Sequence, residues 1–414
     1  MKILYVVHQF YPRYRSGTER VTYNLASMMQ IAGNRVKVVT YCVDHDCPVI
    51  GEYRSIKYNE YIYRKIPVLE FFLDKEPPNF HLSLYNEDVI NFAKQVYSKE
   101  KPDVVHICHP MRVCGFLAAA QEMGIPCVVT ATDLMYICPK IIMNTMKGEL
   151  CKDAERGRRC NIECFDTGNL NVERMELSER LLTGSAFVVA PSEFISYMIK
   201  KQIPNVNCRI IKHGMDYSNV KQQSKVYKKN DQINFGYVGS IQEHKGVHYV
   251  IDSFMEIDAN SISLSIYGDY SNNYGQKLAR KAKKDSRIRF FGGFESDKIE
   301  EVYNEIDVLV VPSLCYESYS LVKHEAIMRN IPVIVSDVGA LGDGIEHGVN
   351  GYKFSLEDRG SLCGILSAIS KNPEKLNDIK SELSYFAVPT IEQESFQYYT
   401  LYKKCKAKNS KKEK

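Results

Sequence analysis

The chain has 414 residues, a formal net charge of +4, and 44% hydrophobic and 25% charged residues, enough for two domains with cores of their own. No run of eighteen or more apolar residues predicts a membrane-spanning helix, and the first residues predict a strand rather than a secretory signal. We therefore expect a cytoplasmic protein whose thirteen cysteines are reduced thiols rather than partners in disulfides.

The first part of the chain alternates apolar runs with an amphipathic stretch, as in a β-α-β unit. Residues 2–7 and 35–40 are expected to be strands, and residues 19–30 the helix between them. Gly17 lies just before this helix, where a glycine lets the backbone approach an anion closely. An ordinary strand-to-helix turn also accounts for Gly17. Residues 41–85 show no clear periodicity.

The same rhythm resumes further along the chain. Helices are expected over residues 85–97 and 170–183, and strands over residues 103–109, 126–130 and 186–190. Ligands bind at the carboxyl ends of strands in open parallel sheets, so His106 and His109 are candidate site residues by position. We interpret His106 as a structural residue and His109 as a candidate for contacting an acceptor.

The segment 138–164 contains four cysteines that suggest a structural zinc site. Thiolates are good tetrahedral zinc ligands, and two of these cysteines are separated by three residues, close to the spacing of a metal knuckle. The alternative is a loop of reduced cysteines packed as small apolar residues. The candidate ligands are Cys138, Cys151, Cys160 and Cys164.

The second half begins after a polar run over residues 217–232 that is expected to be a linker. Strands are predicted over residues 233–239, 263–269, 287–294, 308–312 and 331–336. The spacing of Thr390 and Gln393 is that of a capping box, which predicts a terminal helix over residues 391–402.

Residues 403–414 hold seven lysines and one glutamate. Such a segment is usually a disordered, solvated tail, and the functional alternative is an electrostatic contact with anionic lipid. Basic residues interleaved with aromatic ones, as in RNA-binding modules, do not occur, so we expect no nucleic-acid partner.

The most informative run of the sequence extends from Glu317 to Glu325, between two strand-like segments. We expect Glu317 and Ser318 to begin a helix whose first backbone N–H groups, those of residues 318–320, hold a diphosphate. Helical rise would place Glu325 about 12 Å further along, which suits one carboxylate on a sugar and one on a ribose. The alternative is that Glu317 is only an acidic residue in the first turn of a helix and Glu325 only a solvated one.

This run, together with Lys245 and Gly246 after the strand over residues 233–239, resembles the retaining family-four, or group 1, glycosyltransferases. The resemblance covers the chain from its first residue to about residue 400 and implies the α/β GT-B fold, with two Rossmann-like domains facing a central cleft. A C-terminal helix would cross back to the first domain. The expected divisions are residues 1–215, 216–390, 391–402 and 403–414.

The resemblance also implies an activity and a site. A sugar would pass from a UDP- or GDP-type nucleotide diphosphate sugar to a glycan or lipid-linked acceptor, as in cell-surface polysaccharide or glycoconjugate synthesis, without a catalytic metal. Glu317 would hold sugar hydroxyls, Glu325 the ribose and Lys245 the diphosphate, while Asp133 would contact the sugar or the acceptor. The remaining candidates are Gly17, Gly239, Ser240, Ser318, Tyr319, Ser320 and Leu321 on the donor side, and His109 and Thr132 on the acceptor side.

The chain departs from the family pattern at three positions. Thr18, Thr132 and Ser240 stand where relatives usually carry glycine, histidine and arginine. A threonine does not carry protons at neutral pH as an imidazole does. A non-catalytic nucleotide-sugar-binding scaffold and a nucleotide-sugar epimerase on the same fold are therefore kept as alternatives.

Overall fold

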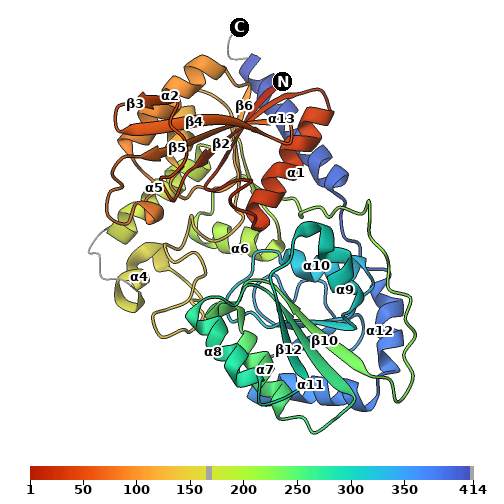
Figure 1. The fold of residues 1–414 in the computed structure, drawn as a ribbon. Coiled ribbons are helices and arrows are strands. Elements are labelled where there is room, and N and C mark those ends of the chain that lie inside the picture. Colours follow the sequence, from red (N-terminus) through yellow and green to blue (C-terminus); the bar gives the residue numbers. More distant parts are fainter. Residues whose placement is uncertain (165–169, 411–414) are drawn as a thin grey trace. The chain divides into compact units, whose positions relative to one another are not determined.

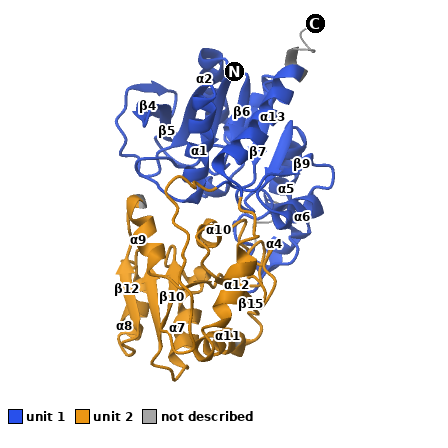
Figure 2. Ribbon diagram, turned by 90° about the vertical axis from the view of Figure 1, so that its right-hand side faces the viewer, with its two compact units in different colours: residues 1–214, 389–414 blue, residues 215–388 orange. Residues whose placement is uncertain are grey.

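The structure is a computed structural model and describes residues 1–164 and 170–410. The chain forms two compact units, residues 1–214 with 389–414, and residues 215–388 (Figure 2). The run expected to be a linker belongs to the second unit, because its Tyr227 ring is buried in that unit's core and the Tyr227 hydroxyl hydrogen bonds with Asp307 (3.1 Å).

The first unit is built on a nine-stranded sheet with the order β3-β4-β5-β2-β1-β6-β7-β8-β9. All neighbouring strands are parallel except β3, β4 and β5, which form an antiparallel meander over the stretch where the sequence shows no periodicity. Strands β6, β7 and β8 are buried along their whole length, as expected where both faces of a parallel sheet are covered. The strands are β1 (Lys2–Val7), β2 (Arg35–Tyr41), β3 (Gly51–Tyr53), β4 (Ile56–Tyr63), β5 (Ile66–Leu73), β6 (Val104–Ile107), β7 (Cys127–Thr130), β8 (Phe187–Ala190) and β9 (Cys208–Ile210).

Helices of the first unit surround this sheet (Figure 1). The side chains of Asn86 and Ser192 cap two of them by accepting hydrogen bonds from backbone N–H groups, as short polar residues at helix starts do. The helices are α1 (Gly17–Ile31), α2 (Glu87–Glu100), α3 (Gly115–Glu122), α4 (Arg158–Glu163), α5 (Leu170–Thr183), α6 (Glu193–Gln202) and α13 (Ile391–Ser410), with 3₁₀ turns η1 (Phe80–Leu82) and η2 (Glu155–Gly157).

Helix α13 is the last element of the chain and packs on α1, β6 and β7 of the first unit. The expectation of a disordered tail over residues 403–414 is wrong for its described part, because α13 continues through Ser410. Cys405 is buried, and Lys406 Nζ forms an ion pair with Asp103 (3.1 Å). Packing on the first unit therefore holds this basic segment in a helix; residues 411–414 lie outside the described residues.

His106 is a structural residue, as interpreted from the sequence. It is fully buried in β6 and hydrogen bonds through Nδ1 with the Tyr402 hydroxyl (2.7 Å) and through Nε2 with Thr130 Oγ1 (2.7 Å). Thr130 Oγ1 in turn hydrogen bonds with the Tyr398 hydroxyl (2.8 Å). Because buried polar groups need partners, this network ties α13 to the centre of the sheet.

Acid is expected to destabilise the protein through His106. Burial lowers the pKa of His106 from 6.5 to about 3, so the imidazole stays neutral in the fold after the unfolded chain has bound a proton. Stability from this residue is complete above pH 6.5 and falls by up to about 1.4 kcal/mol per pH unit as the pH drops toward 3. Denaturant unfolding between about pH 7 and pH 5 should show a flatter dependence for His106→Gln but not for the exposed control His347→Gln; equal slopes for all three proteins would contradict the assignment.

The second unit is built on a six-stranded parallel sheet with the order β12-β11-β10-β13-β14-β15. The strands are β10 (Ile233–Val238), β11 (Ile262–Tyr267), β12 (Ile288–Gly292), β13 (Val308–Val311), β14 (Val333–Ser336) and β15 (Tyr352–Phe354). The helices are α7 (Val247–Met255), α8 (Asn273–Ala282), α9 (Ile299–Asn304), α10 (Leu321–Met328), α11 (Arg359–Lys371) and α12 (Lys375–Leu383), with 3₁₀ turns η3 (Glu243–Lys245) and η4 (Ser296–Lys298).

Each unit has one point where the order of its parallel strands reverses. In the second unit this point lies between β10 and β13, and in the first unit between β1 and β6. Open α/β sheets bind ligands outside the carboxyl ends of the strands at such a switch point. The turns after these four strands are therefore where functional side chains are to be sought.

Candidate functional site

Gly246 holds the two turns of the second switch point together. Its φ of 72° lies in the region that favours glycine, and a Cβ at this position would lie 2.0 Å from the Pro312 carbonyl oxygen just after β13. The Leu314 N–H also donates to the His244 carbonyl oxygen (2.8 Å). The turn after β10 is thus in backbone contact with the loop after β13.

Lys245 and Glu317 form an ion pair across these two turns. Lys245 Nζ lies 2.5 Å from Glu317 Oε1, and Ser313 Oγ donates to the same oxygen (2.5 Å). Burial disfavours both charged forms, but the attraction and the hydrogen bond outweigh it, so that the pKa of Lys245 is raised and the pKa of Glu317 is lowered. Both groups are therefore charged at neutral pH, and both keep part of the side chain exposed, 29% and 16%.

The helix after β13 begins later than the sequence suggests. Glu317 pairs with Gly339 in an isolated parallel bridge, in which the Ala340 N–H donates to the Glu317 carbonyl oxygen (3.0 Å). This pairing keeps Glu317 extended, and Ser320 takes a left-handed φ of 64° before α10 starts at Leu321. The expectation that Glu317 and Ser318 open the helix is therefore wrong.

The first-turn N–H groups of α10, which have no acceptor within the helix, accordingly belong to Leu321, Val322 and Lys323 rather than to residues 318–320. The separation calculated from helical rise also fails, since only part of the Glu317 to Glu325 run is helical. Glu325 is 5% exposed and accepts a hydrogen bond from the Tyr303 hydroxyl (2.8 Å).

Other candidates on the donor side surround the same turns. Ser240, two residues after the end of β10, is exposed, and its carbonyl oxygen accepts a hydrogen bond from the Tyr237 hydroxyl (2.7 Å). The Gly239 N–H donates to the Tyr267 carbonyl oxygen (3.0 Å), so it already has a backbone partner. Tyr319 is buried, and its ring stacks on His324 at 4.0 Å.

The switch point of the first unit brings together His8, after β1, and His109, after β6, whose rings lie 4.0 Å apart. The Met111 N–H donates to His109 Nδ1 (3.2 Å), which leaves Nε2 to carry the proton toward Asp133 Oδ2 (2.6 Å). Burial, and then the positive charge of Arg112, hold the pKa of His8 well below its usual range. His8 is therefore neutral beside the His109–Asp133 pair.

The structure thus joins three residues that the sequence assigns to the acceptor side. Asp133 Oδ1 accepts from the Met135 N–H (2.9 Å), and Thr132 Oγ1 donates to the Cys108 carbonyl oxygen (3.2 Å) beside His109. His8 was missed by sequence reasoning. Its position directly after the first strand is the signal that could have identified it.

Gly17 is the first residue of α1, in the first unit. The adjacent Ser16 hydroxyl donates to the carboxylate of Glu19, a fully buried acid that also lies 3.7 Å from His8 Nε2. Glu19 is a second residue that sequence reasoning did not select. The α1 N-terminus and the two histidines therefore belong to one neighbourhood, while the remaining donor candidates lie in the second unit.

The four cysteines suggested as zinc ligands lie near one another but not at the spacing of a metal's ligands. Over residues 1–164 and 170–410, no three of their sulfur atoms lie within 4.8 Å of one another. Burial raises the pKa of all four thiols, that of Cys138 to about 11 and that of Cys160 to about 12. Cys151 and Cys164 are near backbone carbonyl oxygens instead. The other three thiols, after burial, also raise the pKa of Cys160, so the four lie in one neighbourhood, and a zinc site in this segment stays a prediction.

Comparison with known proteins identifies the family. The family described as Glycosyltransferase Family 4 matches residues 15–219, and the family described as Glycosyl transferases group 1 matches residues 218–383. The two matches are contiguous and extend over both units.

The chain belongs to the group 1 glycosyltransferases.

This group 1 glycosyltransferase is 23% identical over 369 residues to an uncharacterised glycosyltransferase of Methanocaldococcus jannaschii, an alignment that covers 85% of this chain and 84% of the relative. It is 23% identical over 190 residues to the lipopolysaccharide 1,2-N-acetylglucosaminetransferase of Salmonella typhimurium, covering 40% of this chain and 48% of that protein. With two of the curated relatives it matches, the chain thus aligns over about half of their length.

The fold of this group 1 glycosyltransferase is GT-B. A solved structure of Anabaena HepE in complex with UDP and glucose superposes with a TM-score of 0.68 at 17% identity, covering 97% of this chain and 99% of HepE. The expected fold class, two Rossmann-like domains, is confirmed. Within the described residues, no helix has both the length and the apolar character required to cross a membrane.

Proposed function

We propose that the protein is a retaining glycosyltransferase that moves a sugar from a UDP- or GDP-type nucleotide diphosphate sugar to a glycan or lipid-linked acceptor. The observation that carries this proposal is the Lys245–Glu317 ion pair at the β10/β13 switch point. A cation suited to a diphosphate and a carboxylate suited to sugar hydroxyls stand side by side there. Retention rests on the resemblance to retaining relatives.

When the donor binds, Lys245 and Glu317 each contact a different part of it. The diphosphate replaces Glu317 as the counter-ion of Lys245, and the Glu317 carboxylate then accepts hydrogen bonds from sugar hydroxyls. Negative charge grows on the diphosphate as its bond to the anomeric carbon breaks. Lys245 and the first-turn N–H groups of α10 stabilise that charge, so we propose transfer without a catalytic metal.

On the acceptor side, we propose that Asp133 contacts the acceptor hydroxyl or the transferred sugar. His109 and the Met135 N–H fix the orientation of its carboxylate, and a carboxylate held in this way can receive a proton in the reaction. Thr132 does not transfer protons at neutral pH, so its role is limited to hydrogen bonding.

The substrate classes are supported by similar proteins. HepE is solved with UDP and glucose, and the Salmonella typhimurium relative acts on lipopolysaccharide, which favours a nucleotide diphosphate sugar donor and a glycan or lipid-linked acceptor. The exposed lysines in the last turns of α13, Lys403 and Lys404, motivate the further prediction of a peripheral contact with an anionic membrane.

A panel of nucleotide diphosphate sugars tests the proposal. A tight donor raises the unfolding temperature by mass action, and the donors found in this way are then incubated with the protein and candidate glycan or lipid-linked acceptors. We expect one nucleotide and sugar combination to stabilise the protein and to be slowly hydrolysed or transferred with retained anomeric configuration. An inverted product would refute retention.

The same experiment separates the alternatives. Binding without hydrolysis or transfer to any acceptor would favour a nucleotide-sugar-binding scaffold. Conversion of the donor into a second nucleotide or sugar isomer, with no acceptor consumed, would favour an epimerase. Either result would contradict the proposed transfer.

Replacing Glu325 with alanine is expected to weaken binding of UDP- and GDP-sugars by about 10- to 100-fold, because a hydrogen bond to a charged group contributes about 1.5–3 kcal/mol. The ribose is common to all donors, so the loss should not depend on the sugar. Titration calorimetry measures it, with Tyr303→Phe as the control that removes the hydroxyl donating to Glu325 and keeps the carboxylate. Unchanged affinity for Glu325→Ala would contradict ribose binding.

A further inference from the structure

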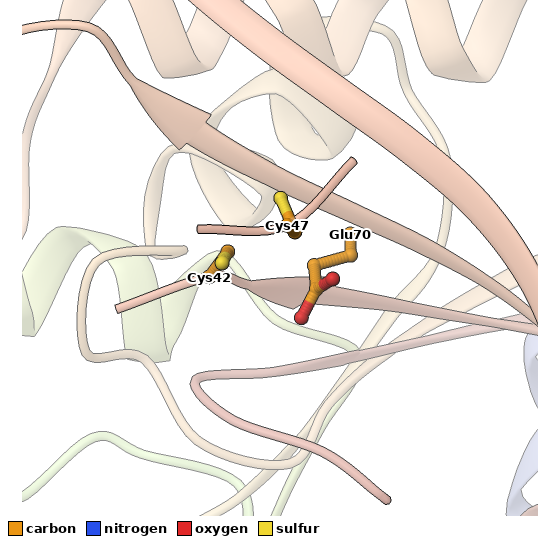
Figure 3. A group of neighbouring side chains, drawn as sticks. All are labelled: Cys42, Cys47 and Glu70. Atoms are coloured by element: carbon orange, nitrogen blue, oxygen red, sulfur yellow. The ribbon is translucent and has the colours of Figure 1, made fainter. Parts of the chain in front are cut away.

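Two buried thiols and a buried carboxyl meet beside strands β2 and β5 of the first unit. Cys42 directly follows β2, Cys47 lies five residues later in the loop, and Glu70 lies within β5, where it pairs with Thr40 of β2 (Figure 3). One potential ligand atom from each of the three residues lies within 4.8 Å of the other two. Over residues 1–164 and 170–410, this is the one such group.

Burial makes this group different from an ordinary set of surface acids. Cys42, Cys47 and Glu70 are 0%, 6% and 7% exposed. The nearest cation is the Arg13 guanidinium, whose Nη1 lies 3.3 Å from Cys42 Sγ. Two thiols and a carboxyl are the donors that a divalent ion of intermediate softness binds, and zinc takes sulfur and carboxylate oxygen together.

We propose that Cys42, Cys47 and Glu70 bind a zinc ion. Zinc–sulfur bonds of about 2.3 Å and zinc–oxygen bonds of about 2.0–2.2 Å place neighbouring ligand atoms of a tetrahedral site about 3.5–3.8 Å apart, a spacing that fits within the 4.8 Å group. A water molecule completes the four ligands, because Asp46, whose Oδ1 lies 3.8 Å from Cys42 Sγ, is already paired with Arg13.

The charges of the ligands, the zinc ion and the neighbouring arginine balance at this site. Two thiolates and the Glu70 carboxylate carry three negative charges, against two positive charges on the zinc ion and that of the Arg13 guanidinium beside Cys42. Asp46 pairs with the same guanidinium, so a neutral water as the fourth ligand adds no further negative charge. On binding, each of the two thiols exchanges its proton for a bond to the metal and the protons pass to solvent, while Glu70 binds as the carboxylate.

The ion would connect the loop after β2 to β5. That loop also holds the β1–α1 segment, because Tyr14 donates to Asp44 (2.7 Å) and Arg13 pairs with Asp46. Zinc would therefore rigidify the approach to the α1 N-terminus and Gly17. The site is built from residues that the proposed sugar transfer does not use, so the two proposals stand or fall separately.

Metal analysis of the full chain, purified in reductant without chelator and dialysed against zinc, tests this proposal. We expect about one equivalent of zinc in the wild-type protein and its loss in Cys42→Ser/Cys47→Ser. The matched control Cys114→Ser/Cys127→Ser, which alters two buried thiols of the same unit outside both cysteine groups, should keep the metal. Substitution by cobalt should give thiolate-to-cobalt charge-transfer absorption in the wild type and control alone.

Glu70→Gln preserves size and tests the site if the double cysteine variant does not fold. Its zinc affinity, measured by competition with a chromophoric chelator, should fall at least about tenfold, the lower end of what losing even a supporting group costs. Absence of bound zinc in the wild type, zinc retained by Cys42→Ser/Cys47→Ser, or a Cys42–Cys47 disulfide in the reduced preparation would each overturn the proposal.

Discussion

Replacing Lys245 with alanine is expected to lower the rate of sugar transfer by about 10²- to 10³-fold, the usual cost of removing one group that stabilises charge in the transition state. Lys245 neutralises the diphosphate most strongly when the glycosidic bond is breaking, so kcat should fall more than KM rises. Steady-state kinetics with the donor found by thermal shift measure both constants.

Two further variants define what the Lys245→Ala result means. Lys245→Arg keeps the positive charge and should retain more activity than alanine, whereas Lys229→Ala removes an exposed lysine of the same unit and should leave kcat unchanged. If the Lys245→Ala protein kept the wild-type kcat and unfolding temperature, Lys245 would have no role in the reaction.

Replacing Glu317 with glutamine is expected to lower kcat/KM by about 10²-fold, since hydrogen bonds to a charged acceptor contribute about 1.5–3 kcal/mol each. The free nucleotide diphosphate should behave in the opposite way. Lys245 would no longer be paired with a carboxylate, so the nucleotide would bind at least as tightly as to the wild type. Kinetics with the sugar donor and calorimetry with the nucleotide alone separate the two effects.

This contrast distinguishes a sugar contact from simple support of Lys245. If Glu317 only positioned Lys245, the glutamine variant would lose affinity for nucleotide and nucleotide sugar alike. Ser313→Ala is the control, because it removes the hydroxyl that donates to Glu317 Oε1 and leaves the ion pair in place. Its loss should be smaller than that of Glu317→Gln.

Elements with strong local periodicity could be predicted closely from the sequence. The strand Lys2–Val7 and the helix Leu170–Thr183 have the bounds that their patterns predict. The start of α10 could not be predicted, since it depends on the Glu317–Gly339 bridge between separate segments. Local propensity does not contain such tertiary pairings.

The same distinction between what the sequence could and could not predict applies to the site residues. Lys245 and Glu317 could be selected because family motifs mark them, but their direct pairing depends on the contact of Gly246 with the Pro312 carbonyl oxygen. The cysteines of segment 138–164 lie near one another without reaching the spacing of metal ligands, whereas Cys42 and Cys47 meet Glu70 through the pairing of β2 with β5. Spacing along the chain cannot show which strands will be neighbours.

The return of α13 to the first unit has a consequence for the order of folding during synthesis. Domains usually fold from the N-terminus as they leave the ribosome, but here the first unit needs Tyr398 and Tyr402 to complete the hydrogen bonds of Thr130 and His106. The second unit, residues 215–388, is a continuous insertion that is fully synthesised before those tyrosines. The nascent chain can therefore finish its second unit first, and the first unit closes only when the last helix has been made.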